Sequence, residues 1–521
     1  MAVIPPYETL VPLLESNGIL WSGFRRKCPG PCGSHVTLGQ FALRVLRQRN
    51  PCELGTLLLC VTKSLPGDEI ERHLELIDRH IISDDEYMGS LEGLECAILQ
   101  SKTYADIGQL RRAWLTNRRG LVFAQLMGLH RTHSSSPEAE SVFWSLFQND
   151  RFTSLLLGLP YGIAESHCDM RVNGKSIPTE PSPEMFVVRL VCIAGRIIDR
   201  TQGTGEPSYA SALDTDQELE SIAAQLPRSW WDIASSPAAD DPVSAAEWQE
   251  IILGQICFHQ TRIYLHMPFM LQSTTNPRYE YSRTACLEGA REMLRLYHLL
   301  RGRGKPPYDC KAVDFLAFTA CIFLILSLLG YGRLAPVQNV DQDTSDWETV
   351  DRTTEILRCA SSEKGGNVAA QSYQALELIG RVRNTDCTAA DTDTNYSAKI
   401  VIPYFGTISV RRNNKFHNQE GAATTSSSRT SVVTPGSSTS SNTNMEAQQA
   451  LGGNSGYDPL IAYDGFYLPN NSFDQQQVSE NPLVNYLFAN SAVPGQSLAN
   501  MDIDQDWSWF MADPQQPQLF T

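Results

Sequence analysis

Cysteine and histidine side chains near the start of the chain could bind zinc, because thiolate and imidazole groups are common protein ligands of that ion. The candidates are Cys28, Cys32, His35 and Cys52. Structural zinc sites usually contain close ligand pairs such as Cys-x2-Cys, and none of the 13 cysteines forms such a pair. One zinc ion on these four residues is one interpretation. Unpaired thiols in a loop is the interpretation that we favour.

Common motifs for hydrolysis and nucleotide binding are absent. The sequence has no His-Glu-x-x-His, Gly-x-Ser-x-Gly or Gly-x-Gly-x-x-Gly pattern. Gly174-Lys175-Ser176 resembles the end of a phosphate-binding loop, but Asp169 stands where such a loop needs its first glycine. We therefore expect that the chain is not an enzyme and that it holds no cofactor.

The distribution of charge argues against nucleic-acid binding by the whole chain. The 521 residues carry a net charge of −16, whereas a nucleic-acid binder needs a basic surface to displace phosphate counterions. No Lys or Arg follows Arg429, but nine carboxylates do. The cysteines are scattered singly on apolar patterns, which is typical of buried thiols in a reducing compartment.

One apolar run, at residues 315–330, invites a membrane interpretation. It is shorter than the roughly 18 residues that a spanning helix needs, and Asp314 precedes it directly. We interpret it as the buried central helix of a large helical domain and expect no membrane association. The first 12 residues lack the basic and apolar regions of a signal peptide.

Helical periodicity dominates the middle of the chain, where apolar residues recur every three or four positions. Residues 396–410 are β-branched and could form a short strand pair, although Pro403 argues against a central strand. We therefore predict an all-α fold with an irregular segment at 1–63, a helical domain at 64–384 and an extended segment packing on it at 385–415. A Ser/Thr-rich disordered linker at 416–456 and an acidic, aromatic tail at 457–521 follow. Helices are expected at 69–82, 91–102, 185–200, 216–225, 245–266, 282–300, 313–329, 347–361 and 368–382.

Segment 109–162 contains two further helices, separated by a Ser-Ser-Ser-Pro break. On the first helix, Leu110, Trp114 and Leu121 share an apolar face. A neighbouring arc carries Arg111, Arg112, Arg118 and Arg119. These arginines could contact phosphates or DNA, but a solvated face that pairs with acidic neighbours is the interpretation that we favour.

The second of these helices carries aromatic side chains followed by an acid and a base. Phe143, Trp144 and Phe147 have the spacing of core residues rather than of a ligand cage. We predict that Asp150 and Arg151 form a buried structural ion pair that ties this helix to another. A catalytic acid beside an oxyanion clamp is the alternative, and nothing in the adjacent sequence completes such a site.

These motifs resemble, in order and spacing, the middle homology region of fungal zinc-binuclear-cluster transcription factors. That family combines an Arg-Ala-Trp helix ending on Gly-Leu-His-Arg, a Phe-Trp-x-Leu-Phe-x-x-Asp-Arg helix and a turn with Gly-x-Pro. A later Leu-His-x-Pro-aromatic segment is followed by Ser-x-x-x-Cys, here Ser282 and Cys286. The matching motif residues are Arg112, Trp114, Gly128, His130, Arg131, Phe143, Trp144, Asp150, Arg151, Pro160, His266 and Pro268.

Two of the matching residues carry structural expectations of their own. Pro268 should end its helix, because proline has no amide hydrogen to donate. We expect His266 to be a capping or core histidine rather than a metal ligand.

The resemblance implies a nuclear transcription regulator, often a homodimer, whose helical region is regulatory. In that family six cysteines hold two zinc ions and present a basic loop to DNA. This sequence lacks the six-cysteine pattern, so the resemblance covers roughly residues 64–384. Zinc and direct DNA contact are expected only if such a cluster lies outside this sequence; otherwise the chain acts through a partner.

The tail combines carboxylates with large aromatic rings. Residues 501–513 alternate aspartates with Trp507, Trp509 and Phe510. Each aromatic ring buried in a partner's groove would contribute about 1.5–3 kcal/mol before ordering costs. We therefore predict an activation segment that binds transcriptional coactivators, with a merely solubilising tail as the alternative.

We expect a fungal transcription regulator in the nucleus, and on family frequency a regulator of a secondary-metabolite gene cluster. The alternatives are a co-regulator or scaffold that does not bind DNA, and a regulator of sugar catabolism. Two short basic stretches, Arg25-Arg26-Lys27 and Arg411-Arg412-x-x-Lys415, are candidate nuclear import signals.

Overall fold

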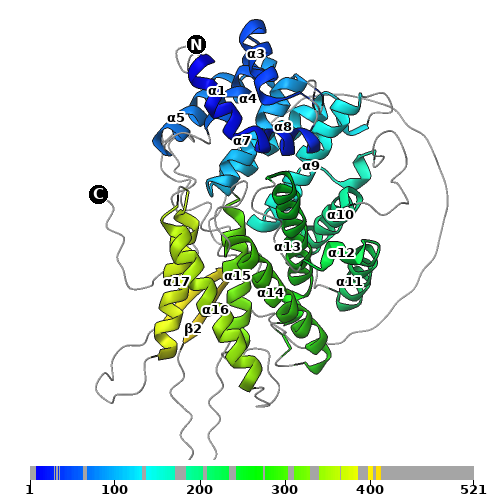
Figure 1. Ribbon diagram of the computed structural model, residues 1–521. Helices are drawn as coiled ribbons and strands as arrows, with labels where there is room; N and C mark the ends of the chain where they lie inside the picture. Colours follow the sequence, from blue (N-terminus) through cyan, green and yellow to red (C-terminus); the bar gives the residue numbers. More distant parts are fainter. Residues whose placement is uncertain are drawn as a thin grey trace, which may run out of the picture. The chain divides into compact units, whose positions relative to one another are not determined.

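The part of the chain that the computed structural model describes consists almost entirely of helices (Figure 1). It describes residues 7–28, 30, 33, 36–62, 67–131, 136–169, 183–203, 208–233, 242–270, 272–273, 276–302, 310–328, 340–363, 365–384, 397–402 and 406–411. Within these ranges the only strands are β1 (Ser397–Ile402) and β2 (Gly406–Arg411). The predicted all-α class is therefore confirmed.

Among the described residues from 7 to 157, nine α-helices surround one cluster of buried side chains, which includes Trp21, Phe41, Leu99 and Phe147. A π-helical turn (Asp78–Ile82) follows α5, and single 3-10 turns (Leu129–Arg131 and Glu165–His167) follow α8 and α9. The helices are α1 (Tyr7–Ser16), α2 (Gly18–Lys27), α3 (Leu38–Gln48), α4 (Pro51–Thr62), α5 (Gly67–Ile77), α6 (Asp85–Met88), α7 (Leu91–Asp106), α8 (Leu110–Leu126) and α9 (Pro137–Leu157).

The prediction of an irregular segment at 1–63 is wrong, because helices α1 to α4 occupy most of the described residues there. The helix α3 begins at a capping box, in which the Thr37 hydroxyl accepts the Gln40 amide and the Gln40 side chain accepts the Thr37 amide. Pro51 stands at the first position of α4, where a missing amide hydrogen costs nothing. The prolines and glycines that suggested irregularity thus include residues that are compatible with helix starts.

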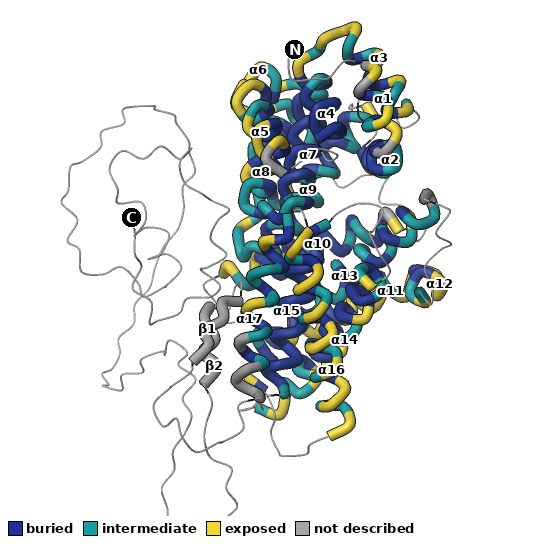
Figure 2. The backbone as a smooth tube through the Cα atoms, turned by 60° about the vertical axis from the view of Figure 1, so that its left-hand side comes forward, coloured by how far each residue is buried: buried dark blue, intermediate teal, exposed yellow. Residues whose placement is uncertain are grey.

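A second cluster of buried side chains lies between the remaining helices. The helix α15 packs against α14, α16 and α17, and every residue from Val313 to Ser327 is buried, which confirms the predicted buried central helix (Figure 2). Among the described residues, no helix has the length and hydrophobicity that crossing a bilayer requires. These helices are α10 (Pro183–Gln202), α11 (Tyr209–Ala224), α12 (Arg228–Trp231), α13 (Pro242–Met270), α14 (Glu280–Arg301), α15 (Ala312–Leu328), α16 (Val340–Ser361) and α17 (Asn367–Asn384).

The two clusters are connected by side chains of α9 and α10, which contact each other. Phe152 of α9 and Val187 of α10 each pack against both clusters. A change in the position of either helix would therefore disturb the packing of both halves of the helical region.

Pro268 lies inside α13, so the expectation that it ends the helix is wrong. A proline inside a helix leaves the carbonyl four residues earlier without its amide donor, and here that carbonyl belongs to Tyr264. The Arg200 side chain of α10 donates to the carbonyl oxygens of Tyr264 and Leu265 at 3.4 and 2.7 Å. This guanidinium replaces the lost backbone hydrogen bond, and α13 continues to Met270.

Strands β1 and β2 form an antiparallel pair with Ile400 opposite Ile408, which confirms the strand pair that the sequence allowed. The predicted linker at 416–456 and tail at 457–521, including Trp507, Trp509 and Phe510, lie outside the described residues. The phosphate-loop-like residues Gly174-Lys175-Ser176 lie outside them as well.

The role of Arg200 can be tested by a double-mutant cycle with Pro268. Arg200→Ala should lower the free energy of unfolding by about 1.5–3 kcal/mol, because it removes charged hydrogen bonds from buried carbonyls. In a Pro268→Ala background the backbone amide of position 268 can again donate to the Tyr264 carbonyl. Arg200→Ala should therefore lower the free energy of unfolding by less in that background. Urea denaturation of the four proteins measures both costs, and equal costs in the two backgrounds would contradict this role.

Candidate functional site

Motif residues of α8 and α9 converge on the turn that follows α9. The Trp114 indole donates to the Ser154 hydroxyl at 2.9 Å, and that hydroxyl donates to the Pro160 carbonyl at 3.2 Å. Arg118 donates to the same carbonyl. Gly158 ends α9 with φ +70°, a conformation that glycine adopts at little cost. The motif thus fixes where the chain turns.

Asp150 is the acidic centre of this arrangement. Its side chain is 1% exposed, and its carboxylate lies 3.0 Å from Arg118 Nε and accepts the Gly162 amide at 2.6 Å. Burial raises the pKa of the Asp150 carboxyl, and Arg118 opposes that shift. Asp150 therefore ties α9 to α8 and to the turn. The sequence predicted a buried charge here that ties this helix to another.

Arg151 is also buried, but its strongest contacts are with residues other than Asp150. Its guanidinium lies between the rings of Phe147 and Tyr161, 4.3 and 4.4 Å from their centroids. It donates to the carbonyl oxygens of Val191 at 3.4 Å and Ile163 at 3.3 Å. Both charges are buried, as predicted, but the predicted ion pair between them is wrong: Asp150 pairs with Arg118, and Arg151 contacts Val191 and Ile163.

The arginines of α8 have the partners that the favoured interpretation requires. Arg118 pairs with Asp150, and Arg119 donates to Asp85 at 2.7 Å. The Arg112 guanidinium stacks over the Tyr104 ring at 5.9 Å. All four arginines of the helix are half-buried, so the prediction of a helix face paired with acidic neighbours is confirmed for Arg118 and Arg119.

The other residues of the first motif lie where α8 ends. Gly128 has φ +73°, and it follows the last turn of α8. His130 is half-buried and its carbonyl accepts the Asp169 amide at 2.8 Å, whereas Arg131 is exposed. Phe143 and Trp144 are 2% and 6% exposed, which confirms them as core residues.

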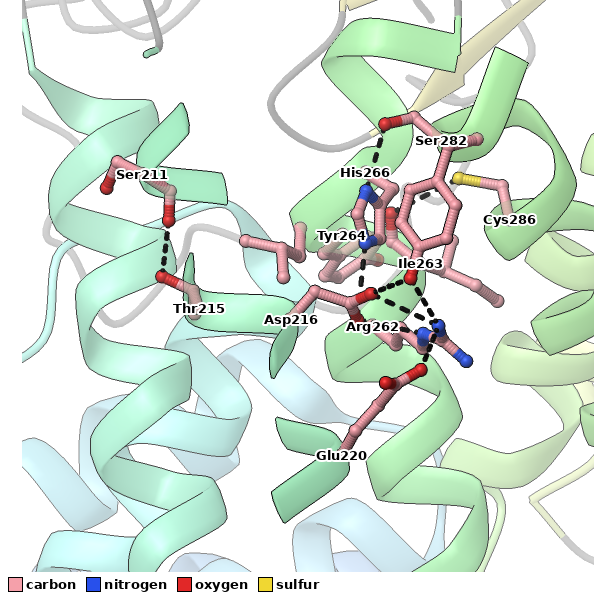
Figure 3. A network of polar contacts seen from close by, with 12 residues as sticks. Ser211, Thr215, Asp216, Glu220, Arg262, Ile263, Tyr264, His266, Ser282 and Cys286 are labelled. Carbon is pink, nitrogen blue, oxygen red and sulfur yellow. Dashed lines mark hydrogen bonds and ion pairs between the residues drawn. The ribbon is translucent and has the colours of Figure 1, made fainter. Parts of the chain in front are cut away.

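His266 belongs to a polar network that joins α11, α13 and α14 (Figure 3). Its Nε2 lies 3.2 Å from Asp216 and its Nδ1 lies 2.9 Å from the Ser282 hydroxyl. Arg262 donates to both Asp216 oxygens at 2.9 and 3.1 Å, and the Tyr281 hydroxyl donates to the same carboxylate. The prediction of a core histidine is confirmed.

A hydroxyl, an imidazole and a carboxylate in a row resemble the groups that activate a serine nucleophile. Here Ser282 and His266 are both 0% exposed, so substrate has no access to the hydroxyl. Asp216 is already neutralised by Arg262 and cannot serve mainly to stabilise an imidazolium. The arrangement therefore clamps three helices together and offers no route for acyl transfer.

The clamp sets the ionisation of Asp216. Burial by itself would raise the pKa of this carboxyl, but hydrogen bonds from His266, Arg262 and Tyr281 together hold the pKa well below its usual range. A depressed pKa means that the folded state favours the carboxylate, so the clamp stabilises the protein above the ordinary aspartate pKa and loses that contribution as pH falls.

Sequence reasoning missed several buried charges. Arg25 was assigned to a candidate import signal, but its side chain is 0% exposed and pairs with Glu95 of α7. Its neighbour Arg26 pairs with Glu250 of α13 at 2.8 Å. Arg301 and Asp314 form another buried pair at 2.7 Å. The available signal for the burial of Arg25 was its place one helical turn from Trp21 and Cys28, both of which are buried.

The zinc candidates are only partly described. Cys28 and Cys52 are buried, and burial raises the pKa of each thiol to about 11. Cys32 and His35 lie outside the described residues. No group of three or more metal-binding side chains converges in the part of the chain that the structure describes. The choice between a zinc site and unpaired thiols stays a prediction.

Comparison with known proteins identifies relatives of the helical region. The Dehydrocurvularin biosynthesis regulator of Alternaria cinerariae is 28% identical over 451 residues, which cover 80% of this chain and 57% of the relative. Transcription factor sdnS of Sordaria araneosa is 26% identical over 458 residues, covering 79% of this chain and 58% of the relative. The Zn(2)-C6 fungal-type transcription factor mpsB of Macrophomina phaseolina is 26% identical over 204 residues, covering 33% and 27%.

These relatives confirm that the chain is similar to fungal transcription factors over most of its length. The chain spans less than three fifths of the length of the two longer matches. No family model matches the chain. No solved structure matches it.

The tight approach of α10 to Arg151 generates a prediction about Gly195. A Cβ at Gly195 would collide with the Arg151 guanidinium, which its stacked rings and carbonyl partners hold in place. Gly195→Ala should therefore lower the free energy of unfolding by about 1–3 kcal/mol. Gly380→Ala is the matched control, because a Cβ there meets nothing within 4 Å, and it should stabilise α17 by about 0.5–1 kcal/mol. Urea denaturation compares them; destabilisation of the same size in both would contradict the packing argument.

The Asp216 clamp generates a prediction about pH. Asp216→Asn should lower the free energy of unfolding by about 3–5 kcal/mol at pH 7, because it removes the buried charge that Arg262, His266 and Tyr281 contact. Below about pH 4 this carboxyl binds protons in the unfolded chain before it does so in the folded protein, so the wild type progressively loses the stabilisation and the difference between the two proteins should narrow. Glu220→Gln removes the 56%-exposed partner of Arg262 and should cost less than about 1 kcal/mol. A gap that stays constant from pH 7 to pH 3 would show that the charge of Asp216 is irrelevant.

Proposed function

We propose that this chain is a fungal transcription regulator that controls a biosynthetic gene cluster. The observation that carries the proposal is its similarity, over 80% of its length, to a protein named as a biosynthesis regulator. The helical region supports it, because the motif residues act there as internal ties between helices. We propose regulation rather than enzymatic catalysis, and the nucleus as the place of action.

Within this proposal, the helical residues 64–384 form the middle homology, or regulatory, domain. Support comes from the sequence motifs and from their joint placement around α8, α9, α13 and α14. Helices α1 to α4 share one buried cluster with α7 and α9, so we extend the structural unit that carries regulation to the first described helix. Homodimerisation, implied by the resemblance, stays a prediction.

DNA recognition by this chain has two candidate routes. The sequence has no six-cysteine zinc-cluster pattern, which favours contact with DNA through a partner protein. Similarity to a protein named as a Zn(2)-C6 type favours contact through a zinc cluster outside the sequence given. Both routes imply that the sequence given does not bind DNA by itself. A gel-shift assay with the full chain, with and without zinc, tests this: we expect no sequence-specific shift.

The regulatory role predicts a transcriptional phenotype in the source fungus. Deletion of the gene should lower the transcripts of a contiguous group of biosynthetic genes, and re-expression should restore them. RNA sequencing of the deletion strain and the complemented strain measures the effect. Unchanged transcripts for every biosynthetic gene group, under conditions in which the gene is expressed, would reject the proposal.

The activation role of the tail predicts a reporter phenotype. The full chain fused to a heterologous DNA-binding module should activate a reporter, and changing Trp507, Trp509 and Phe510 to alanine should abolish most of that output. Loss of each ring removes about 1.5–3 kcal/mol of burial from the coactivator complex, and 1.4 kcal/mol is a tenfold change in affinity.

The matched control changes Tyr463, Phe466 and Tyr467 to alanine, which removes three rings from the less acidic part of the tail. This control should retain more output than the Trp507, Trp509 and Phe510 variant. Equal output from both variants and the parent protein would reject the activation role of residues 501–513.

A further inference from the structure

The surface of α8 has an inverted pattern of exposure. Its three exposed residues are all apolar: Leu115 and Val122 are each 45% exposed and Leu126 is 75% exposed. The arginines of the same helix are half-buried. A surface helix normally turns its polar residues to water and its apolar residues to the core. We call Leu115, Val122 and Leu126 the α8 stripe.

The members of the α8 stripe lie along one side of the helix. They stand at positions i, i+7 and i+11, which lie on one side of an α-helix and span about 16 Å of its axis. The opposite side of α8 packs on α7 and α9, where Ala113, Leu121 and Ala124 are buried. The row therefore has the length and spacing that an amphipathic segment of another element would cover.

The charge around the stripe favours an acidic occupant. Residues 107–137 contain five arginines and no carboxylate. Arg119, which stands between Leu115 and Val122, has its side chain 38% exposed and pairs with Asp85, which is 80% exposed. An ion pair so accessible to water is weak and can exchange partners. A second copy of α8 would place arginines opposite arginines, so we do not favour self-association here.

The tail of this chain has the complementary chemistry. Residues 501–513 contain four aspartates, no cation, and the apolar side chains Ile503, Trp507, Trp509 and Phe510. From the last described residue, Arg411, to Met501 a Ser/Thr-rich connection of about 90 residues would reach roughly 50 Å if it behaves as a coil. Because both elements belong to one chain, a weak contact is strengthened by the effective concentration.

We propose that residues 501–513 dock on the α8 stripe of their own chain, and that this contact withholds Trp507, Trp509 and Phe510 from coactivators. The regulatory consequence rests on the proposed activation role, whereas the docking itself does not. Whatever weakens the contact then raises transcription, since the same three rings cannot occupy both surfaces. The stripe is thus the structural element through which the helical region would restrain the tail.

Site-specific photocrosslinking in the full chain tests the docking directly. We place p-benzoylphenylalanine at position 126, irradiate, and map the crosslinked peptides by mass spectrometry. The expected result is an intramolecular crosslink into 501–513 that does not depend on protein concentration and decreases in the Asp502→Asn, Asp504→Asn, Asp506→Asn variant. The control probe at position 340 of α16, which is 64% exposed, should not capture this segment. Crosslinks to the α8 of another molecule, to another protein, or to no tail peptide would overturn the proposal.

The reporter fusion of the full chain tests whether docking restrains transcription. Changing Leu115, Val122 and Leu126 to glutamate should raise reporter output roughly fivefold or more, the size of a typical coupling between two sites. Val340→Glu, an equally polar change at another exposed apolar residue, should leave the output unchanged. Leu126→Glu alone changes only the most exposed position of the stripe, and circular dichroism checks that its helix content equals that of the parent protein. Output equal to the Val340→Glu control would overturn the restraint.

The two experiments separate this proposal from the proposed function. A crosslink into 501–513, with no reporter activity even when Leu115, Val122 and Leu126 are changed to glutamate, would leave docking intact and reject the activation role of the tail. Reporter activity that depends on Trp507, Trp509 and Phe510 without the crosslink would leave the activation role intact and reject docking.

Discussion

The structure depends on the pairing of charges that are buried between helices. An ion without a partner in a protein interior costs several kcal/mol, so each buried arginine requires oxygen acceptors on a neighbouring element. Arg25 has Glu95, Arg151 has the carbonyls of Val191 and Ile163, and the partly buried Arg262 has the buried Asp216. Glu95, Val191 and Asp216 lie on three different helices, which restricts how the helices can pack. Apolar burial drives the collapse, and we infer that the need to pair these charges reduces the number of helix arrangements that remain.

The motif residues acquire their meaning from this constraint. Trp114, Asp150 and Pro160 meet at one turn, and the buried His266 joins three helices through Asp216 and Ser282. None of them offers a reactive group to solvent. Function is therefore assigned to the surfaces that such a framework holds in place, above all to the exposed apolar row of α8, and to the acidic tail.

Periodicity was sufficient to predict most helices from 64 to 384 and the buried character of α15. It failed at 1–63, because the prolines and glycines there were given more weight than the apolar spacing of α1 to α4. It failed at Pro268, because the partner that compensates for the missing amide is Arg200, 68 positions earlier in the sequence. The partners of Asp150 and Asp216 were equally invisible, since local sequence does not report which helices become neighbours. The inverted exposure of α8 likewise appears only in the folded chain.

The central claim is that the motif residues act through the fold and the tail acts on transcription. Thermal unfolding and reporter output of the full chain with Asp150→Asn, measured together over a range of temperatures, test it most directly. We expect the variant to be destabilised by about 3–5 kcal/mol and to recover its output at temperatures at which it remains folded. A folded Asp150→Asn protein without output would contradict the account, because it would mean that this carboxylate takes part in regulation itself.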